Sequence, residues 1–211
     1  MLCAALTVAT GFWEQAAVIS SLNASISRAI ATEANRRIIA ERQHLTGREV
    51  SFDESQVIVS KTDTKGLITY ANETFLDVSG FTEEELIGAP HSILRHPAMP
   101  RCVFKFLWDN IFAGEEVFAY VLNRAKNGDH YWVFAHVTPS RDHTGQITGF
   151  HSNRRVPQKT AIATIEPIYA SLLEVERKAA TPKEAVENGI AALVDFVTKT
   201  GMSYSELVFT L

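Results

Sequence analysis

The spacing of apolar residues divides the chain into three regions. In residues 13–45, apolar side chains recur three or four positions apart, as at Ile19, Leu22 and Ile26, which predicts one long helix. The apolar stripe is narrow, as in a seam between two helices. We therefore expect residues 1–49 to form an N-terminal helix that is a coiled-coil or docking segment, and packing of the helix on its own domain is an equal alternative.

The start of the chain is apolar but lacks the features of a membrane anchor. Residues 2–13 carry no charge, Glu14 interrupts the run, and residues 15–27 are uncharged but include several Ser and Asn. A transmembrane helix needs about 20 apolar residues, and a signal peptide has Lys or Arg before its apolar run. A helix that is soluble or bound to a partner is expected here, with a membrane-associated segment as the alternative.

The middle region mixes strand and helix patterns. Tight turns are predicted at Asp63–Gly66, where Asp and Gly favour a turn, and at the hairpin signal Asn127–Gly128. A capping box at Thr82–Glu85 begins one of several short helices. The predicted strands are 56–61, 67–70, 117–123, 130–139 and 146–155, and the predicted helices include a short one at 72–78 and a longer one at 100–112. This order indicates an α+β fold, a five-stranded antiparallel sheet with helices on one face, over residues 50–156.

Residues 157–211 have the pattern of a helical extension. We expect Pro167 to begin a helix that carries Tyr169 and other apolar residues. The segment Thr181–Glu184 combines an N-cap, a proline and a glutamate that can return a hydrogen bond, so it predicts a second helix start. A last short helix follows the cap at Ser203–Glu206.

Composition narrows the functional classes. The 211 residues are 46% hydrophobic and carry a net charge of −4, without the basic patch that nucleic-acid binding requires. The two cysteines, Cys3 and Cys102, form neither a disulfide framework nor a metal-binding spacing, which fits a reducing cytoplasm. Motifs of nucleophilic hydrolases, P-loop proteins, dinucleotide-binding proteins and zinc proteases are absent from the sequence, so we do not expect an enzyme.

Four motifs in the middle region resemble PAS domains. They are Thr69–Phe75, Ser79–Gly88, Ile93–Pro100 and Asn123–Trp132, and together they look most like the PAS domain of bacterial aerotaxis receptors. The resemblance implies a sensor that holds FAD between the sheet and the short helices. In that family, the redox state of the flavin reports oxygen or electron transport to the chemotaxis machinery.

The resemblance also has implications for partners. Aerotaxis receptors typically carry a membrane anchor, a HAMP unit and a methyl-accepting signalling domain, and none of these is visible in this sequence. If the chain signals, it must therefore act on a separate protein, such as a chemotaxis receptor, or be a detached sensing piece. We expect a cytoplasmic homodimer that signals through its flanking helices.

The same resemblance implies a set of cofactor-binding residues. Amide side chains suit the polar edge of a flavin, an arginine suits phosphates or a reduced ring, and aromatic rings stack on it. Two positions depart from the family pattern: Ala98 stands where Asp is usual, and Val117 stands where Trp is common. The residues that match the family's motifs are Asn72, Arg95, His96, Trp108, Asn123, Tyr131 and Trp132.

Two alternatives to a flavin sensor remain open. His91, His96 and His136 each offer an imidazole that could bind a haem iron, so a haem or small-ligand sensor is one of them. A PAS module without a ligand, used for dimerisation or docking, is the other. The reactive cysteine motif of light-sensing relatives is absent around Cys102, so a flavin–cysteinyl photocycle is not expected.

Overall fold

The computed structural model describes residues 44–211, and the expectations for the N-terminal helix and its apolar start lie outside this part. Within it, residues Leu45–Leu211 form one compact unit. None of the helices in this described part is both long and apolar enough to cross a membrane.

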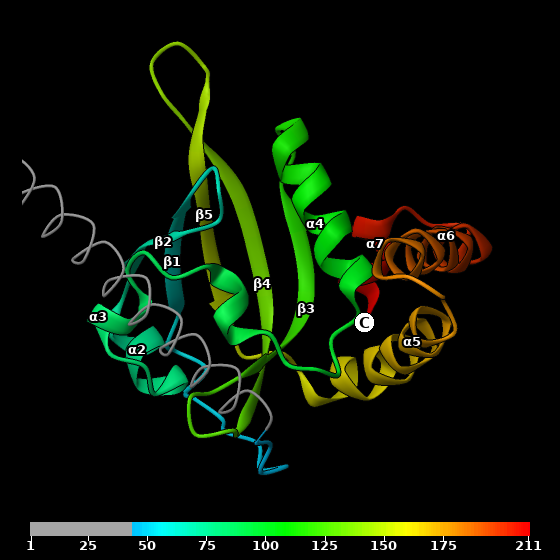
Figure 1. Ribbon diagram of the computed structural model, residues 1–211, viewed down its shortest axis with the longest axis horizontal. Coiled ribbons are helices and arrows are strands. Elements are labelled where there is room, and N and C mark those ends of the chain that lie inside the picture. The colour runs from blue at the N-terminus through cyan, green and yellow to red at the C-terminus, as the bar shows by residue number, and fades with distance from the viewer. Residues whose placement is uncertain (1–43) are drawn as a thin grey trace, which may run out of the picture. The chain divides into compact units, whose positions relative to one another are not determined.

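The core of the unit is a five-stranded antiparallel sheet, as predicted. Its strands have the spatial order β2-β1-β5-β4-β3 (Figure 1), so the β1–β2 hairpin is joined to the β3–β4–β5 meander through the central pairing of β1 with β5. The bounds are β1 Ile58–Asp63, β2 Ile68–Ala71, β3 Val117–Arg124, β4 His130–Arg141 and β5 Ile147–Arg155. The predicted turn before β2 is present, where Gly66 has a positive φ of 78° and Asp63 accepts a hydrogen bond from the Lys65 N–H.

Local capping signals begin and end the short helices that follow β2. Asn72 caps α2, which ends at Gly80 with a φ of 70°, and Thr82 and Glu85 form the predicted capping box of α3. The longer α4 then lies beside β3 (Figure 1). It buries Val103, Leu107 and Ile111 among other residues. The bounds are α2 Glu73–Ser79, α3 Glu83–Leu86, η1 His91–Leu94 and α4 Arg101–Ala113.

The C-terminal helices pack against the α/β unit. They are α5 Lys159–Arg177, α6 Pro182–Thr200 and α7 Tyr204–Thr210. The prediction that Pro167 begins a helix is wrong, because Pro167 lies inside α5. The apolar positions of α5 run through the proline without a break, at Ala161, Ile165, Tyr169 and Leu172, and all four are buried. Burial of this stripe offsets the cost of an internal proline, about 3 kcal/mol.

Glu176 ties the C-terminal helices to α4. The side chain is buried, and its carboxylate accepts hydrogen bonds from the backbone N–H groups of Arg101 (3.0 Å) and Cys102 (2.8 Å). These N–H groups begin α4, whose N-cap residue Pro100 offers no side-chain hydrogen bond. The first turn of α4 is therefore capped by a residue from another helix.

Asp129 joins the β3–β4 hairpin to the segment before β1. Its buried carboxylate accepts hydrogen bonds from Thr46 Oγ1, from the Arg48 guanidinium (Nε at 2.9 Å) and from Asn127 Nδ2 (2.9 Å). The hydrogen bonds from Arg48 and then Thr46 lower the pKa of Asp129 to about 2.

The depressed pKa of Asp129 predicts a loss of stability in acid. A carboxyl group with a lower pKa in the folded state stabilises the fold above its unfolded pKa, so this contribution disappears as the pH falls from about 4 to about 2. We expect Asp129→Asn to be less stable than the wild type at pH 7 and to lose less stability between pH 4 and 2. Urea unfolding across this range measures both effects.

Asp109→Asn is the matched control for this titration. Asp109 pairs with Lys105 on the exposed side of α4, and exposed pairs contribute little to stability. A wild-type pH profile in Asp129→Asn would contradict the assignment.

Candidate functional site

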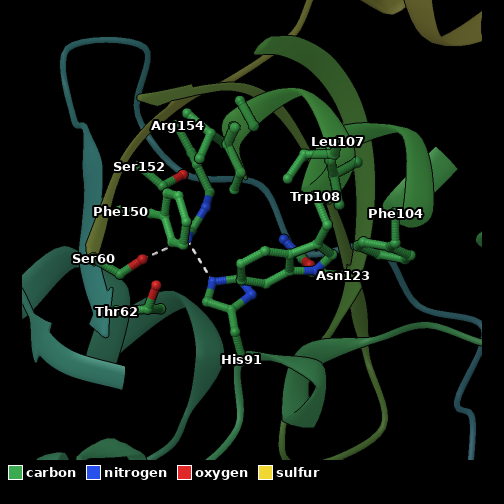
Figure 2. Close-up of a pocket in the computed structure, with 14 residues that line it drawn as sticks. Ser60, Thr62, His91, Phe104, Leu107, Trp108, Asn123, Phe150, Ser152 and Arg154 are labelled. Carbon is green, nitrogen blue, oxygen red and sulfur yellow. Dashed lines mark hydrogen bonds between the residues drawn. The ribbon is translucent and has the colours of Figure 1, made fainter. Parts of the chain in front are cut away.

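A cavity lies between the sheet and α4. Alternation along the strands turns every second side chain toward it, so that Val121 and Asn123 of β3 face the same side as Phe150, Ser152 and Arg154 of β5. From the opposite side, η1 contributes His91, and α4 contributes aromatic and aliphatic side chains (Figure 2). The cavity has a volume of about 60 Å³.

A second cavity of about 210 Å³ adjoins the first. The two share four lining residues, His91, Phe104, Trp108 and Asn123. The second cavity is also lined by Lys65, Gly66 and Arg95, among others. The pair of cavities therefore extends from the middle of the sheet to the loop between β1 and β2.

Aromatic rings form part of the wall. Trp108 meets Phe150 edge to face, with ring centroids 5.5 Å apart, and Phe112 packs on the same phenylalanine at 5.0 Å. Gly66 lies so close to the indole that an added Cβ would come within 3.0 Å of it. The loop before β2 therefore holds the Trp108 ring against the cavity.

Polar atoms without partners face the first cavity. Within the described residues, four of its buried side-chain atoms have no hydrogen-bond partner. They are Thr62 Oγ1, Asn123 Nδ2, Ser152 Oγ and Arg154 Nη1. Leaving such a group buried without a partner costs about 1–3 kcal/mol, and native structures keep few of them. Four such atoms on one cavity wall fit a site for a polar ligand.

Arg154 is the charged group of this wall. Only 2% of its surface is exposed, and its Nη2 donates to Ser60 Oγ at 2.5 Å and to His91 Nε2 at 2.7 Å. Burial lowers the pKa of Arg154 to about 10, and burial together with the Arg154 charge lowers the pKa of His91 to about 3. At neutral pH the arginine is therefore charged and the histidine is neutral.

Three of the residues predicted from the family resemblance meet at these cavities. Trp108 and Asn123 line both of them, and Arg95 lines the second. The Arg95 guanidinium lies over the Phe104 ring, 4.3 Å from its centroid. A short backbone bridge pairs Arg95 with Asn123. An arginine, an amide and an indole that are separated in the sequence are thus brought together.

Asn72 and His96 lie outside the lining of both cavities. Asn72 Oδ1 accepts hydrogen bonds from the N–H groups of Val59 and Phe75, and its Nδ2 donates to the Val57 carbonyl. His96 Nδ1 accepts from the Ala98 N–H at 3.1 Å. The Asn72 side chain therefore serves to join β1 to α2.

Tyr131 and Trp132 face opposite sides of the sheet, and neither lines the two cavities. Tyr131 pairs with Asn123 across β3 and β4 and is fully buried, which raises the pKa of its phenol. Trp132 packs on the other face against Tyr169 of α5, with ring centroids 6.3 Å apart. Trp132 thus contacts the C-terminal helices instead of the cavity.

Of the three histidines considered for haem, His91 alone lines the cavities. His136 lies on the opposite face, where it contacts Glu116 at 2.7 Å and stacks on Phe118. Among residues 44–211, no cluster of His, Cys, Asp and Glu is arranged to hold a metal ion. Cys102 is buried outside the cavities, and burial raises the pKa of its thiol to about 12, so it is not a reactive thiolate.

Sequence reasoning missed Ser60, Thr62, Ser152 and Arg154 as site residues. A signal was present in the last strand, where Phe150, Ser152 and Arg154 occupy alternate positions and so share one face. A buried strand rarely carries an arginine on its inner face unless the charge has a partner or a function. The pairing of β5 with β1 places this face beside Ser60 and Thr62.

Comparisons with known proteins agree with this architecture. Residues 68–154 match the family model described as PAS fold. The aerotaxis receptor of Escherichia coli K12 is 39% identical over 134 residues, which is 64% of this chain and 26% of the receptor. The nitrogen fixation regulatory protein of Klebsiella pneumoniae is 26% identical over 103 residues, 49% of this chain and 21% of that protein. The matched region is thus about a quarter or less of these relatives.

Solved structures also match part of this chain. One from work on a flavin analogue and the light-oxygen-voltage domain mechanism superposes with a TM-score of 0.48 and 23% identity. The superposition covers 56% of this chain and 90% of that one.

Proposed function

We propose, from the premise that residues 68–154 form a PAS domain, that this chain is a redox or oxygen sensor module that binds a flavin as FAD. The observation that carries the proposal is the set of four buried polar atoms without partners on the wall of one cavity. The 39% identity to the aerotaxis receptor supports the same conclusion. The module passes its signal to a separate protein and performs no catalysis itself.

The chemistry of the wall fits a flavin. The pyrimidine edge of the ring presents carbonyl oxygens and ring nitrogens, and Asn123, Thr62, Ser152 and Arg154 offer an amide, two hydroxyls and a guanidinium to them. When bound, the flavin supplies the redox chemistry. The side chains hold its edge and exclude water. Arg95, on the second cavity, suits the phosphates.

The cavities must enlarge before a flavin can bind. Pockets for cofactors usually measure about 300–1,000 Å³, which is more than either cavity offers. His91 and Trp108 line both cavities, so we propose that these two side chains rotate when the ligand enters and that the two spaces then join and widen. We propose that a flavin enters with such a movement, and that Trp108 then packs against the ring.

The same movement provides a route for the signal. Trp108 belongs to α4, and the N-terminus of α4 is capped by Glu176 of α5. Gly189 of α6 approaches Cys102 of α4 so closely that an added Cβ would come within 2.8 Å of it. A shift of α4 therefore changes its packing with α5 and α6, and a small bias at such a seam is enough to switch it. A signalling partner, such as a chemotaxis receptor, would bind these helices and respond to the change in their packing.

An absorption spectrum of the purified chain, before and after dithionite, tests the proposal. We expect flavin bands that bleach on reduction, either in the protein as purified or after incubation with FAD. A Soret band would instead support the haem alternative and direct attention to His91. A protein that stays colourless after incubation with FAD and haemin would overturn the proposal in favour of a docking module.

A further inference from the structure

The charges around the two cavities have one sign. Three cationic residues line them, Lys65, Arg95 and Arg154, and no aspartate or glutamate is among the lining residues within the described part of the chain. Arg154 lies deepest, and none of the ion pairs within residues 44–211 includes it. Burying a cation that has no carboxylate partner costs free energy, and a negatively charged ligand beside the cation reduces this cost.

The groups that face Arg154 leave its charge uncompensated. Ser60 and His91 accept its hydrogen bonds, and both are neutral at pH 7. Its guanidinium lies 5.1 Å from the Phe75 ring centroid, and the nearby Tyr131 phenol stays protonated because burial raises its pKa. The second terminal nitrogen, Nη1, is buried and has no partner in the described structure. The arginine therefore directs a full positive charge into the cavity.

We infer that Arg154 makes the cavity favour the anionic form of its ligand, so that a flavin is bound more tightly reduced than oxidised. This inference rests on the proposed function. Two electrons and one proton convert the neutral oxidised ring into a reduced ring with one negative charge. A fixed cation in a buried site stabilises that charge far better than it would in water. By linkage, tighter binding of the reduced form raises the midpoint potential of the bound flavin.

Neutral and charged replacements of Arg154 test the inference in the full chain. We expect the ratio of the affinities for reduced and oxidised flavin to fall at least about tenfold in Arg154→Met. For a two-electron couple, this fall equals a midpoint potential about 30 mV lower. Arg154→Lys keeps the charge and should stay close to the wild-type potential. The potentials are measured by reductive titration against a reference dye.

A control separates charge from hydrogen bonding. Thr62→Val removes a hydroxyl from the same wall without changing the charge, so it should weaken both redox forms alike and leave the potential in place. If Arg154→Met does not fold by circular dichroism, Arg154→Gln replaces it, because glutamine is neutral but still donates to Ser60.

The outcomes separate the inference about Arg154 from the proposed function. If the wild type binds flavin and the neutral variants keep its potential, the inference is overturned and the proposed function stands. If the wild type binds no flavin, both are overturned.

Discussion

Flavin affinity is expected to fall at least about tenfold when Asn123 is replaced by leucine, while the ligand-free protein keeps its stability. Asn123 Nδ2 is buried on the cavity wall without a partner in the described residues, so its burial costs free energy until a ligand accepts its hydrogen bond. Leucine has a similar shape and carries no such cost. The loss of one ligand hydrogen bond is worth about 1.4 kcal/mol or more, which is a factor of ten.

Asn72→Leu is the matched control, because its effects should have the opposite pattern. Its side chain joins β1 to α2 through the Val57 carbonyl and the Val59 N–H, and both groups lose their partner in the variant. We expect a loss of about 2–3 kcal/mol in the free energy of unfolding and no change in flavin affinity.

Two measurements on each variant decide between these patterns. Urea unfolding of the ligand-free protein gives the stability, and fluorescence titration with FAD gives the affinity. A loss of affinity in Asn72→Leu with wild-type affinity in Asn123→Leu would contradict the assignment of the cavity and restore Asn72 as a ligand.

Ala135→Leu is expected to abolish flavin binding, with a loss of about 100-fold or more. Ala135 lies on β4, directly opposite Arg154 of β5, and its side chain lines the first cavity. The cavity has only about 60 Å³, so three added carbon atoms occupy the space that a ring needs. The fold should survive, because extra methylenes in a packed interior cost about 1–3 kcal/mol and this site contains a cavity.

Thr138→Leu controls for the added bulk. Thr138 is on the same strand, an odd number of residues from Ala135, so it faces the opposite side of the sheet. Flavin titration monitored by absorbance should give wild-type affinity for Thr138→Leu and no binding for Ala135→Leu. Wild-type binding by Ala135→Leu would place the ligand elsewhere.

The local elements of this fold could be predicted from the sequence alone. The turn at Asp63–Gly66, the capping box at Thr82–Glu85 and the hairpin signal Asn127–Gly128 all act within a few residues, and the structure contains each of them. The strands between them follow from apolar residues at every second position, and the helices follow from apolar residues three or four positions apart. Four ordered motifs were then sufficient to indicate a PAS domain, which the family match at residues 68–154 confirms.

The tertiary structure decided which polar residues meet at the cavity. Arg154 and Ser60 are separated by 94 positions, and only the pairing of β5 with β1 brings them into contact. Strand pairing also turns Trp132 away from the cavity, and the packing of α5 supplies Glu176 to the start of α4. Hydrogen bonds and charges of this kind depend on sheet register and helix packing. No local pattern encodes them, because one residue of slip would turn every side chain of a strand to the other face.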